Sequence, residues 1–291
     1  MIPHIVSPGP FSLGEGCLWD HRLQRLYWID INERKLAWLD RDGITTIRDL
    51  PGTPGTVVLT SDPAAVALAL DNGIHTYQTD TGLIHRIAAY PESPATRFND
   101  GKCDSAGRFW VGTMSREGNH GAGTLYCLTP GRSLESRVPS VTVSNGLCWS
   151  RDDQTFYFID SATREVHAFD FDPGSGAISG RRVAVAIPPD RGYPDGMTID
   201  SQDRLWVAHW MGGCVACYDP ITGETVAKID LPTPRVTSCC FGGEDFRTLY
   251  ITTAIGSPDG GWTDLDEYPQ TGAIFALTLG VGGRESNPLP L

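Results

Sequence analysis

Four short stretches place an acid or amide side chain beside a glycine, just ahead of an apolar run. They are GEGCLW with Glu15, RFNDG with Asn99, SNGLCW with Asn145 and YPDGMTID with Asp195. The last three side chains follow one another at intervals of 46 and 50 residues. Two carboxylates and two amide carbonyls make a hard oxygen ligand set, suited to Ca²⁺, Mg²⁺ or Mn²⁺ and tolerable for Zn²⁺ or Fe²⁺. Because the set contains no His or Cys, it argues against a closed structural zinc site.

Each phrase alone has another interpretation. Asn-Gly and Asp-Gly are common turn dipeptides because both residue types tolerate positive φ. Only the joint occurrence of the four phrases at a regular interval favours a shared site.

The elements that would position these side chains form an internal repeat. A turn rich in Asp, Gly or Arg is followed by a short apolar, aromatic strand, and the copies are 40 to 49 residues apart. The central strand residues of the six copies are Tyr27, Ala67, Trp110, Tyr157, Trp206 and Tyr250. A second alternating stretch follows each copy, which is typical of half-buried antiparallel strands.

A repeat of this length with several short strands is typical of a β-propeller blade. We therefore predict an all-β fold, a six-bladed β-propeller with a central metal-binding channel; an irregular β-sandwich is the alternative. No linker-like composition interrupts the chain, so residues 1–291 are expected to form a single domain. The innermost strand of each blade lines the channel, and the loops entering those strands ring one mouth. We expect the four oxygen-bearing side chains to converge there.

Composition limits the partners. The chain has 23 basic and 35 acidic residues, a formal charge of -12, which disfavours binding to nucleic acid or an anionic membrane surface. No run approaches the roughly 20 apolar residues of a membrane helix, and the first residues lack the pattern of a signal peptide. Eight cysteines are too sparse for a disulfide scaffold in a chain of 291 residues, so a cytoplasmic protein with reduced thiols is expected.

The phrases GEGCLW, RFNDGKCDSAGRFWVGTM, SNGLCWS and YPDGMTID together resemble the regucalcin and gluconolactonase family, also called senescence marker protein. The resemblance runs from about Gly14 to Leu277. It implies a six-bladed propeller that holds one divalent metal ion and hydrolyses aldonolactones, the cyclic esters of sugar acids. By position it implies that the metal ligands are Glu15, Asn145 and Asp195, and that the substrate contacts are Arg97, Asn99 and Glu117. Glu117 lies in a loop that is short in this sequence.

These residue types suit the reaction. A lactone needs its carbonyl polarised, a water delivered and its ring oxygen protonated as it leaves. Asp195 is the predicted catalytic base as well as a metal ligand, while Arg97 and Asn99 would hydrogen-bond the substrate. Asp100 and Lys102 are assigned to turn structure and the surface.

Two other functions remain open on the sequence alone. The protein could be a non-enzymatic calcium-binding or partner-binding propeller, or a metal-dependent esterase acting on aryl esters or organophosphates through an apolar mouth. His209 is expected to be a core or supporting histidine, and His120 either lines the mouth or is solvated. Absence of a G-x-S-x-G elbow gives serine hydrolase chemistry no support. The expected partner is a small sugar lactone, which one is undetermined, and the expected state is a monomer or weak oligomer.

Overall fold

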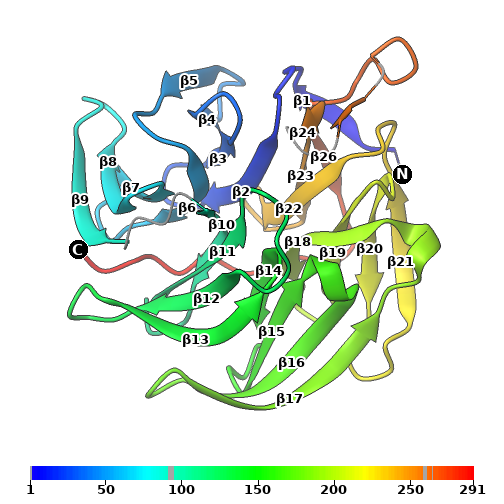
Figure 1. Ribbon diagram of the computed structural model, residues 1–291. Helices are drawn as coiled ribbons and strands as arrows, with labels where there is room; N and C mark the ends of the chain where they lie inside the picture. The colour runs from blue at the N-terminus through cyan, green and yellow to red at the C-terminus, as the bar shows by residue number, and fades with distance from the viewer. Residues whose placement is uncertain (1, 91–94, 258–260, 264) are drawn as a thin grey trace.

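The computed structural model describes residues 2–90, 95–257, 261–263 and 265–291. In this part of the chain, six four-stranded antiparallel sheets are arranged as blades around a central channel (Figure 1). The prediction of an all-β, six-bladed propeller is therefore confirmed.

Each blade runs from an innermost strand at the channel to an outermost strand at the surface. In that order, blades 1 to 3 are β2 (Gly14–Asp20), β3 (Arg25–Asp30), β4 (Lys35–Leu39) and β5 (Thr45–Asp49); β6 (Pro54–Leu59), β7 (Ala65–Leu70), β8 (Gly73–Gln78) and β9 (Ile84–Ala89); and β10 (Thr96–Cys103), β11 (Phe109–Ser115), β12 (Gly123–Leu128) and β13 (Leu134–Val141). Blades 4 to 6 are β14 (Ser144–Trp149), β15 (Thr155–Asp160), β16 (Glu165–Asp172) and β17 (Ala177–Ala186); β18 (Tyr193–Ile199), β19 (Leu205–Trp210), β20 (Cys214–Tyr218) and β21 (Thr225–Asp230); and β22 (Val236–Gly242), β23 (Thr248–Thr253), β26 (Ile274–Thr278) and β1 (His4–Ser7).

The sixth blade closes the ring. Its outermost strand is β1, near the start of the chain, which pairs antiparallel with β26, near its end. A β-sheet that shares strands from both ends of the chain holds the ring shut and covers an edge that would otherwise be unpaired. A short two-stranded sheet, β24 (Gly256–Ser257) and β25 (Gly261–Trp262), extends from this blade.

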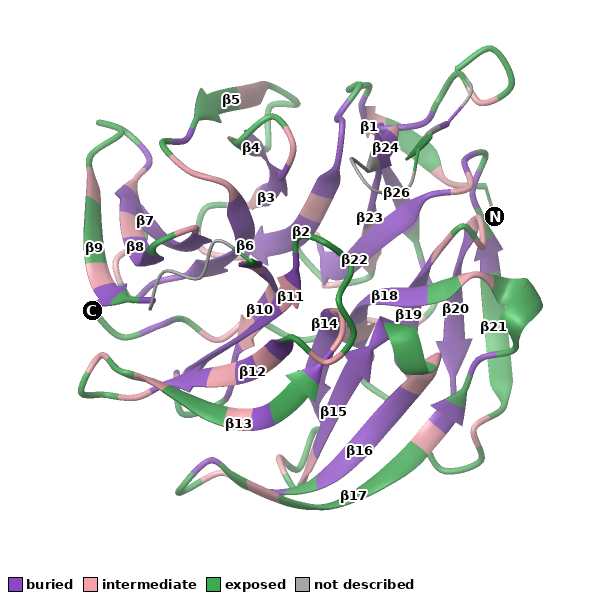
Figure 2. Cartoon of the chain, viewed as in Figure 1, coloured by how far each residue is buried: buried purple, intermediate pink, exposed green. Residues whose placement is uncertain are grey.

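Burial falls from the channel to the outside. Strands β6, β7 and β14 are buried at every position, whereas β21 is exposed at all but one. Figure 2 shows the same gradient, with purple inner strands and green outer strands. The apolar side chains of the second and third strands of each blade pack against the neighbouring blade, so the core is a ring of clusters between blades.

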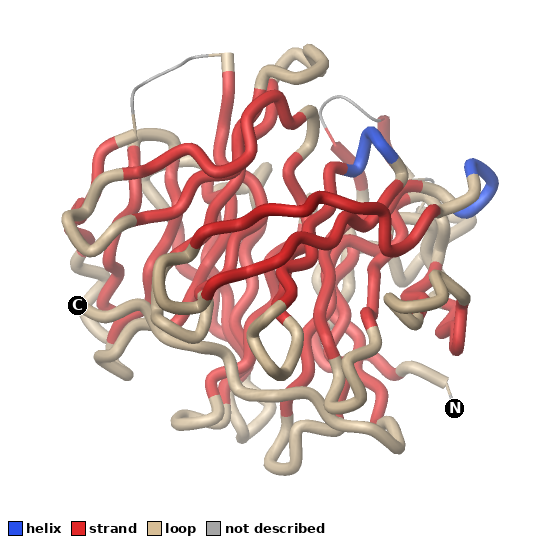
Figure 3. The backbone as a smooth tube through the Cα atoms, turned by 90° about the horizontal axis from the view of Figure 1, so that it is seen from below, coloured by secondary structure: helices blue, strands red, loops and turns tan. Residues whose placement is uncertain are grey.

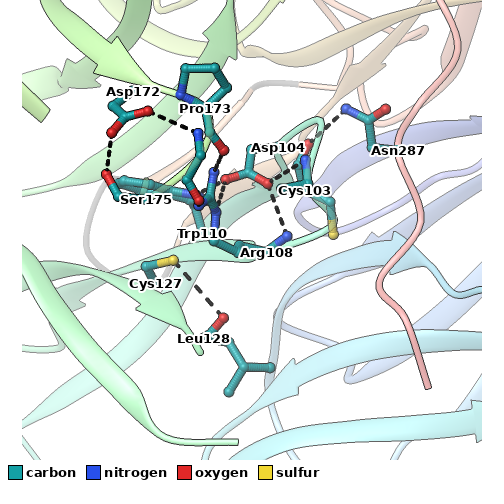
Figure 4. A network of polar contacts seen from close by, with 12 residues as sticks. Cys103, Asp104, Arg108, Trp110, Cys127, Leu128, Asp172, Pro173, Ser175 and Asn287 are labelled. Atoms are coloured by element: carbon teal, nitrogen blue, oxygen red, sulfur yellow. Dashed lines mark hydrogen bonds and ion pairs between the residues drawn. The ribbon is translucent and has the colours of Figure 1, made fainter. Parts of the chain in front are cut away.

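The recurring turn phrase of the sequence has a structural cause. In blade 3 the buried carboxylate of Asp104 accepts hydrogen bonds from Arg108 Nε at 2.6 Å and from Trp110 Nε1 at 2.9 Å (Figure 4). Asp200 makes the same two contacts in blade 5, with the Arg and Trp that stand four and six residues after it. The carboxylate therefore fixes the turn from the innermost strand to the second strand, and its buried charge is paired.

The two ends of the channel differ. The helices η1 (Ser161–Thr163) and η2 (Pro189–Arg191), blue in Figure 3, lie together at one end of the propeller. At the other end, the C-terminal segment lies across the channel, where Arg284 donates to the carbonyl of Trp149 at 2.9 Å and Leu289 donates its N–H to the carbonyl of Leu59 at 2.8 Å.

All eight cysteines are buried free thiols. Among the described residues, no helix has the length and apolar character needed to cross a membrane.

Candidate metal centre and substrate cavity

A cavity of about 380 Å³ opens at the channel mouth near the two short helices. Five predicted site residues line it: Arg97, and four that we call the floor, Glu15, Asn99, Asn145 and Asp195. They come from the innermost strands of blades 1, 3, 4 and 5. The structure thus brings together side chains that lie up to 180 residues apart in the sequence.

A β-bulge marks the position of the floor residues. In β10, β14 and β18 two residues stand opposite a single residue of the next strand, and Asn99, Asn145 and Asp195 are the first of each such pair. In β2 the bulge directly follows Glu15. Because a bulge bends the strand and re-aims its side chains, it can present an oxygen donor at the mouth while the rest of the strand stays packed.

At Asn145 and Asp195 the adjacent glycine serves close packing rather than a turn. A Cβ on Gly146 would lie 2.5 Å from the Cβ of Met197 and 2.7 Å from the carbonyl oxygen of Asp195 in the next blade. A Cβ on Gly196 would lie 2.5 Å from Ser238 Oγ, again in the next blade. Neither glycine has positive φ. The turn interpretation of these two dipeptides is therefore wrong: glycine is needed there because neighbouring innermost strands nearly touch.

Two further carboxylates hold the loops that enter the innermost strands. Asp30 accepts from the backbone N–H groups of residues 12 and 13, at 2.7 and 3.1 Å, directly before β2. Asp160 accepts from those of residues 142 and 143, both at 2.9 Å, directly before β14. Both acids end the second strand of their own blade, so each blade fixes the approach to its own site residue.

A chain of hydrogen bonds connects the floor across blades 3, 4 and 5. Arg97 Nη1 donates to Asn99 Oδ1 at 2.7 Å, and Asn99 Nδ2 donates to Asn145 Oδ1 at 3.0 Å. Asn145 Nδ2 donates to Ser161 Oγ at 2.8 Å, and Ser161 donates to the carbonyl of Pro194 at 2.6 Å. These bonds fix the orientation of both amides, because each amide has its oxygen and its nitrogen paired with different partners.

Burial and neighbouring negative charges disfavour the ionised forms of the two floor acids, Glu15 and Asp195. Burial, and next the neighbouring charge of Asp100, raise the pKa of Glu15 to about 8. Burial, and next the charge of Glu15, raise the pKa of Asp195 well above its ordinary range. Within the described residues, Asp195 Oδ1 is buried without a hydrogen-bond partner.

These observations fit a bound cation. A positive ion would offset the repulsion between Glu15 and Asp195, and the unpartnered oxygen of Asp195 would bind it. The described part of the chain holds no group of three or more His, Cys, Asp or Glu side chains placed to bind one metal ion. Asn99 and Asn145 line the same cavity and offer amide oxygens beside the two acids.

Asp100 and Lys102 do not lie in a surface turn, as the sequence had suggested. Both line a narrower part of the channel below the floor, together with residues of β2, β6 and β22. Lys102 Nζ donates to the carbonyl of Met197 at 2.9 Å, and burial raises the pKa of Asp100. The assignment to turn and surface is wrong because RFNDGKC is itself an innermost strand, β10, and the bulge places Asp100 inside the channel.

The remaining candidates lie at different depths. Glu117 is on an exposed loop after β11, where Asn119 Nδ2 donates to its carboxylate at 3.3 Å; its predicted contact with substrate stays a prediction. His120, on the same loop, lines the cavity. His209 is fully buried, with Nδ1 2.8 Å from the carbonyl of Arg191 and Nε2 3.0 Å from the hydroxyl of Tyr218, so it supports blade 5.

Sequence reasoning did not single out three residues that line the cavity: Ser161, Tyr193 and Trp210. Ser161 could have been predicted from the sequence, because it directly follows Asp160, the acid that ends the second strand of blade 4. Tyr193 stands two residues before Asp195, the same spacing that separates Arg97 from Asn99. Trp210 is Tyr193's partner across the β18–β19 pair.

Fold and site together define a six-bladed propeller with a carboxylate and amide pocket at one mouth of its channel. The profile described as the SMP-30/gluconolactonase/LRE-like region matches residues 13–255. The chain therefore belongs to this family, as the resemblance in its sequence implied.

Similar proteins agree over nearly the whole chain. Regucalcin of Gallus gallus is 36% identical, over 98% of this chain and 96% of its own. Pentonolactonase of Haloferax volcanii is 37% identical, over 94% and 92%. Among solved structures, the calcium-binding protein regucalcin of Agrobacterium tumefaciens has a TM-score of 0.93 at 28% identity, covering 99% of this chain and 97% of its own.

Proposed function

We propose that this protein is a metal-dependent lactonase that opens an aldonolactone to its aldonic acid, in the breakdown of carbohydrates. The observation that carries the proposal is the buried, unpartnered oxygen of Asp195 beside the second carboxylate, Glu15, at the floor of an open cavity. One relative supports the reaction class, since it is named a pentonolactonase.

Glu15, Asn145 and Asp195 are the proposed ligands of one divalent ion. When bound there, such an ion polarises a substrate carbonyl and lowers the pKa of a water molecule. Oxygen ligands of this kind accept Ca, Zn, Mn, Mg or Fe(II), so the identity of the ion is a matter for measurement. The calcium-binding regucalcin structure is consistent with a divalent ion in this fold.

Asp195 is the proposed general base. A water molecule beside its carboxylate would lose a proton to it as the water oxygen attacks the lactone carbonyl carbon. The bond between that carbon and the ring oxygen then breaks, and the same carboxyl group returns the proton to the leaving oxygen. Atoms and charge balance, because one water adds across one ester bond.

Arg97 and Asn99 are the proposed substrate contacts. The guanidinium of Arg97 is held by Asn99 Oδ1 and, at 2.9 Å, by the carbonyl of Phe98, so its planar group has a fixed orientation at the mouth. A fixed guanidinium can donate to ring hydroxyls or to the developing charge on the carbonyl oxygen. Glu117 is a proposed third contact, from the loop beside His120.

The test is hydrolysis of a panel of aldonolactones, followed with a pH indicator, on protein stripped by a chelator and resupplied with single divalent ions. Activity that disappears on stripping and returns with metal is expected. Phenyl acetate serves as the comparison substrate. Metal binding without hydrolysis of any lactone would favour a binding propeller, and a preference for phenyl acetate over every lactone would favour an aryl esterase.

A further inference from the structure

The cavity has a polar floor but a largely apolar rim. In an innermost strand, or in the extended residue that leads into it, the side chain two positions before a floor residue lies on the same face and nearer the mouth. Those positions are Leu13 before Glu15, Arg97 before Asn99, Val143 before Asn145 and Tyr193 before Asp195. All four line the cavity, and only the one in blade 3 is charged.

Much of the remaining lining is also apolar, while Thr142 and Ser161 add hydroxyl groups to it. Ile31, beyond the end of β3, and Met114, opposite Arg97 in β11, add further apolar surface. Trp210 lines the cavity from β19, directly opposite Tyr193. We call the rim the set Leu13, Ile31, Met114, Val143, Tyr193 and Trp210. The basic side chains of the upper cavity, Arg97 and His120, lie instead on the blade 3 side.

Both aromatic rings of the rim are held in place. The guanidinium carbon of Arg164 lies 3.7 Å from the ring centroid of Tyr193, and Arg164 Nη1 also donates to the carbonyl of Gly192. The guanidinium carbon of Arg235 lies 5.4 Å from the ring centroid of Trp210. A cation over an aromatic face stabilises the position of that ring, so the two rings form a pre-oriented wall.

Such a rim discriminates among lactones. A hydroxyl placed against aliphatic or aromatic carbon loses hydrogen bonds to water and gains none, whereas a methyl or alkyl group there is removed from water favourably. Hydroxyls near the reacting carbonyl meet Asn99 on the floor and Arg97 directly above it. The cavity therefore suits a molecule that is polar at one end and apolar at the other.

We propose that the substrate is a lactone that is hydroxylated on its ring and ends its exocyclic group in a methyl or alkyl carbon, the class of deoxysugar or alkyl-substituted lactones, with Tyr193 and Trp210 receiving that end. This inference rests on the proposed lactonase function. Tyr193 and Trp210 are thereby specificity-determining residues, distinct from the floor residues that perform the reaction.

A matched pair of substrates tests it on the metal-reconstituted full chain. Galactono-1,4-lactone and its 6-deoxy counterpart, fucono-1,4-lactone of the same configuration, differ by one exocyclic hydroxyl. The 6-deoxy lactone is expected to have a kcat/KM at least about tenfold higher, the lower end of what one buried group contributes, because the cavity is open to water. The difference should lie mainly in KM.

Variants then connect the preference to the rim. Trp210→Ala and Tyr193→Ser should bring the ratio of kcat/KM for the two lactones to within about threefold of unity. Met211→Ala is the control, because Met211 follows Trp210, is 51% exposed and does not line the cavity. Tyr193 is 42% exposed, so its variant should fold even if Trp210→Ala does not.

Equal or faster hydrolysis of galactono-1,4-lactone would overturn the inference and leave the lactonase proposal standing. A strong deoxy preference that survives both rim substitutions would also overturn the roles of Tyr193 and Trp210. No hydrolysis of either lactone, or of the wider aldonolactone panel, would overturn both proposals together.

Discussion

At the floor of the cavity, two carboxylates share a space that holds too few donors for them. Asp195 has a buried oxygen without a partner, and the carboxylate of Glu15 accepts from the adjacent backbone N–H of Gly16 at 3.1 Å. A buried charge that is not paired destabilises the folded state. The metal-free protein should therefore be less stable than it would be with either acid neutralised, a cost located at the residues proposed to carry the function.

Asp195→Asn separates stability from activity. The amide is neutral at every pH, whereas burial and Glu15 raise the pKa of Asp195 and make its ionised form unfavourable in the folded state, so the free energy of unfolding of the metal-free protein should rise by about 1 kcal/mol or more. Lactone hydrolysis should fall by at least about 10²-fold, because a general base and a metal ligand are both lost. Urea titration and steady-state kinetics measure the two effects, with Asp42→Asn, at a 74% exposed side chain, as the control. Wild-type activity in Asp195→Asn would contradict the mechanism.

The pH dependence of stability tests Glu15. Its pKa of about 8 in the folded state lies above that of an unfolded chain, so the folded protein binds the extra proton. Stability contributed by that proton is complete at pH 4 and is lost as pH rises toward 8, by at most about 1.4 kcal/mol per pH unit. Metal-free protein should thus become less stable from pH 5 to pH 8, as followed by thermal unfolding.

Glu15→Gln should flatten this slope, because the amide does not titrate. Metal binding should show the opposite trend in the unmodified protein, with affinity increasing up to about pH 8 as the carboxyl loses its proton. A stability profile identical in Glu15→Gln and wild type would show that another group controls it.

At the scale of strands, the site depends on how closely innermost strands approach one another. β14 and β18 meet at Gly146, whose missing Cβ lets the carbonyl of Asp195 lie beside it. The bulge in each strand then directs one side chain to the mouth. Small displacements between these two strands would therefore change the spacing of two proposed metal ligands without altering either of them.

Gly146→Ala tests this dependence. A Cβ would lie 2.5 Å from the Cβ of Met197, closer than atoms can pack, so β14 and β18 must separate. Overpacking of this kind should cost about 1–3 kcal/mol of stability, and metal affinity should fall at least about tenfold. Gly280→Ala is the matched control, since a Cβ there meets no atom within 4 Å. Unchanged metal affinity in a folded Gly146→Ala protein would contradict this account.

At the scale of the whole molecule, both ends of the chain help to close the propeller. β1 completes the sixth blade, and the C-terminal segment crosses the end of the channel opposite the cavity. Leu289 is 5% exposed and packs in the core cluster of blades 2 and 3, while its backbone pairs with Leu59 and Ser61. This segment therefore joins the end of the chain to blades 2 and 3, which lie far from it in the sequence.

Leu289→Ala should lower the free energy of unfolding by about 2–4 kcal/mol, as expected for a buried leucine. Lactone kinetics of the folded variant should stay within about twofold, because the change lies at the far end of the channel. Leu291→Ala, at a 50% exposed residue, should have little effect on thermal unfolding. Equal stability of the two variants would show that the C-terminal segment contributes little to the fold.

The sequence alone determined the number of blades and most of the floor. Turn phrases and alternating strands recur every 40 to 49 residues, and such local patterns can be recognised without knowledge of contacts between distant residues. Asn99, Asn145 and Asp195 follow one another at about one blade each and Glu15 opens the first blade, so their convergence followed once the propeller was inferred. The roles assigned to them, and to Glu117, came from the family resemblance and remain predictions.

The tertiary structure decided what depends on contacts between blades. Asn-Gly and Asp-Gly are turn signals in isolation, and only the neighbouring strand shows that their glycines serve close approach. Asp100 looked like a turn residue because charge beside glycine is usually solvated, but the bulge in β10 places it inside the channel. The apolar rim, with Tyr193 opposite Trp210, likewise forms only where four blades meet. The spacing of these residues in the sequence does not show that their side chains line the same cavity.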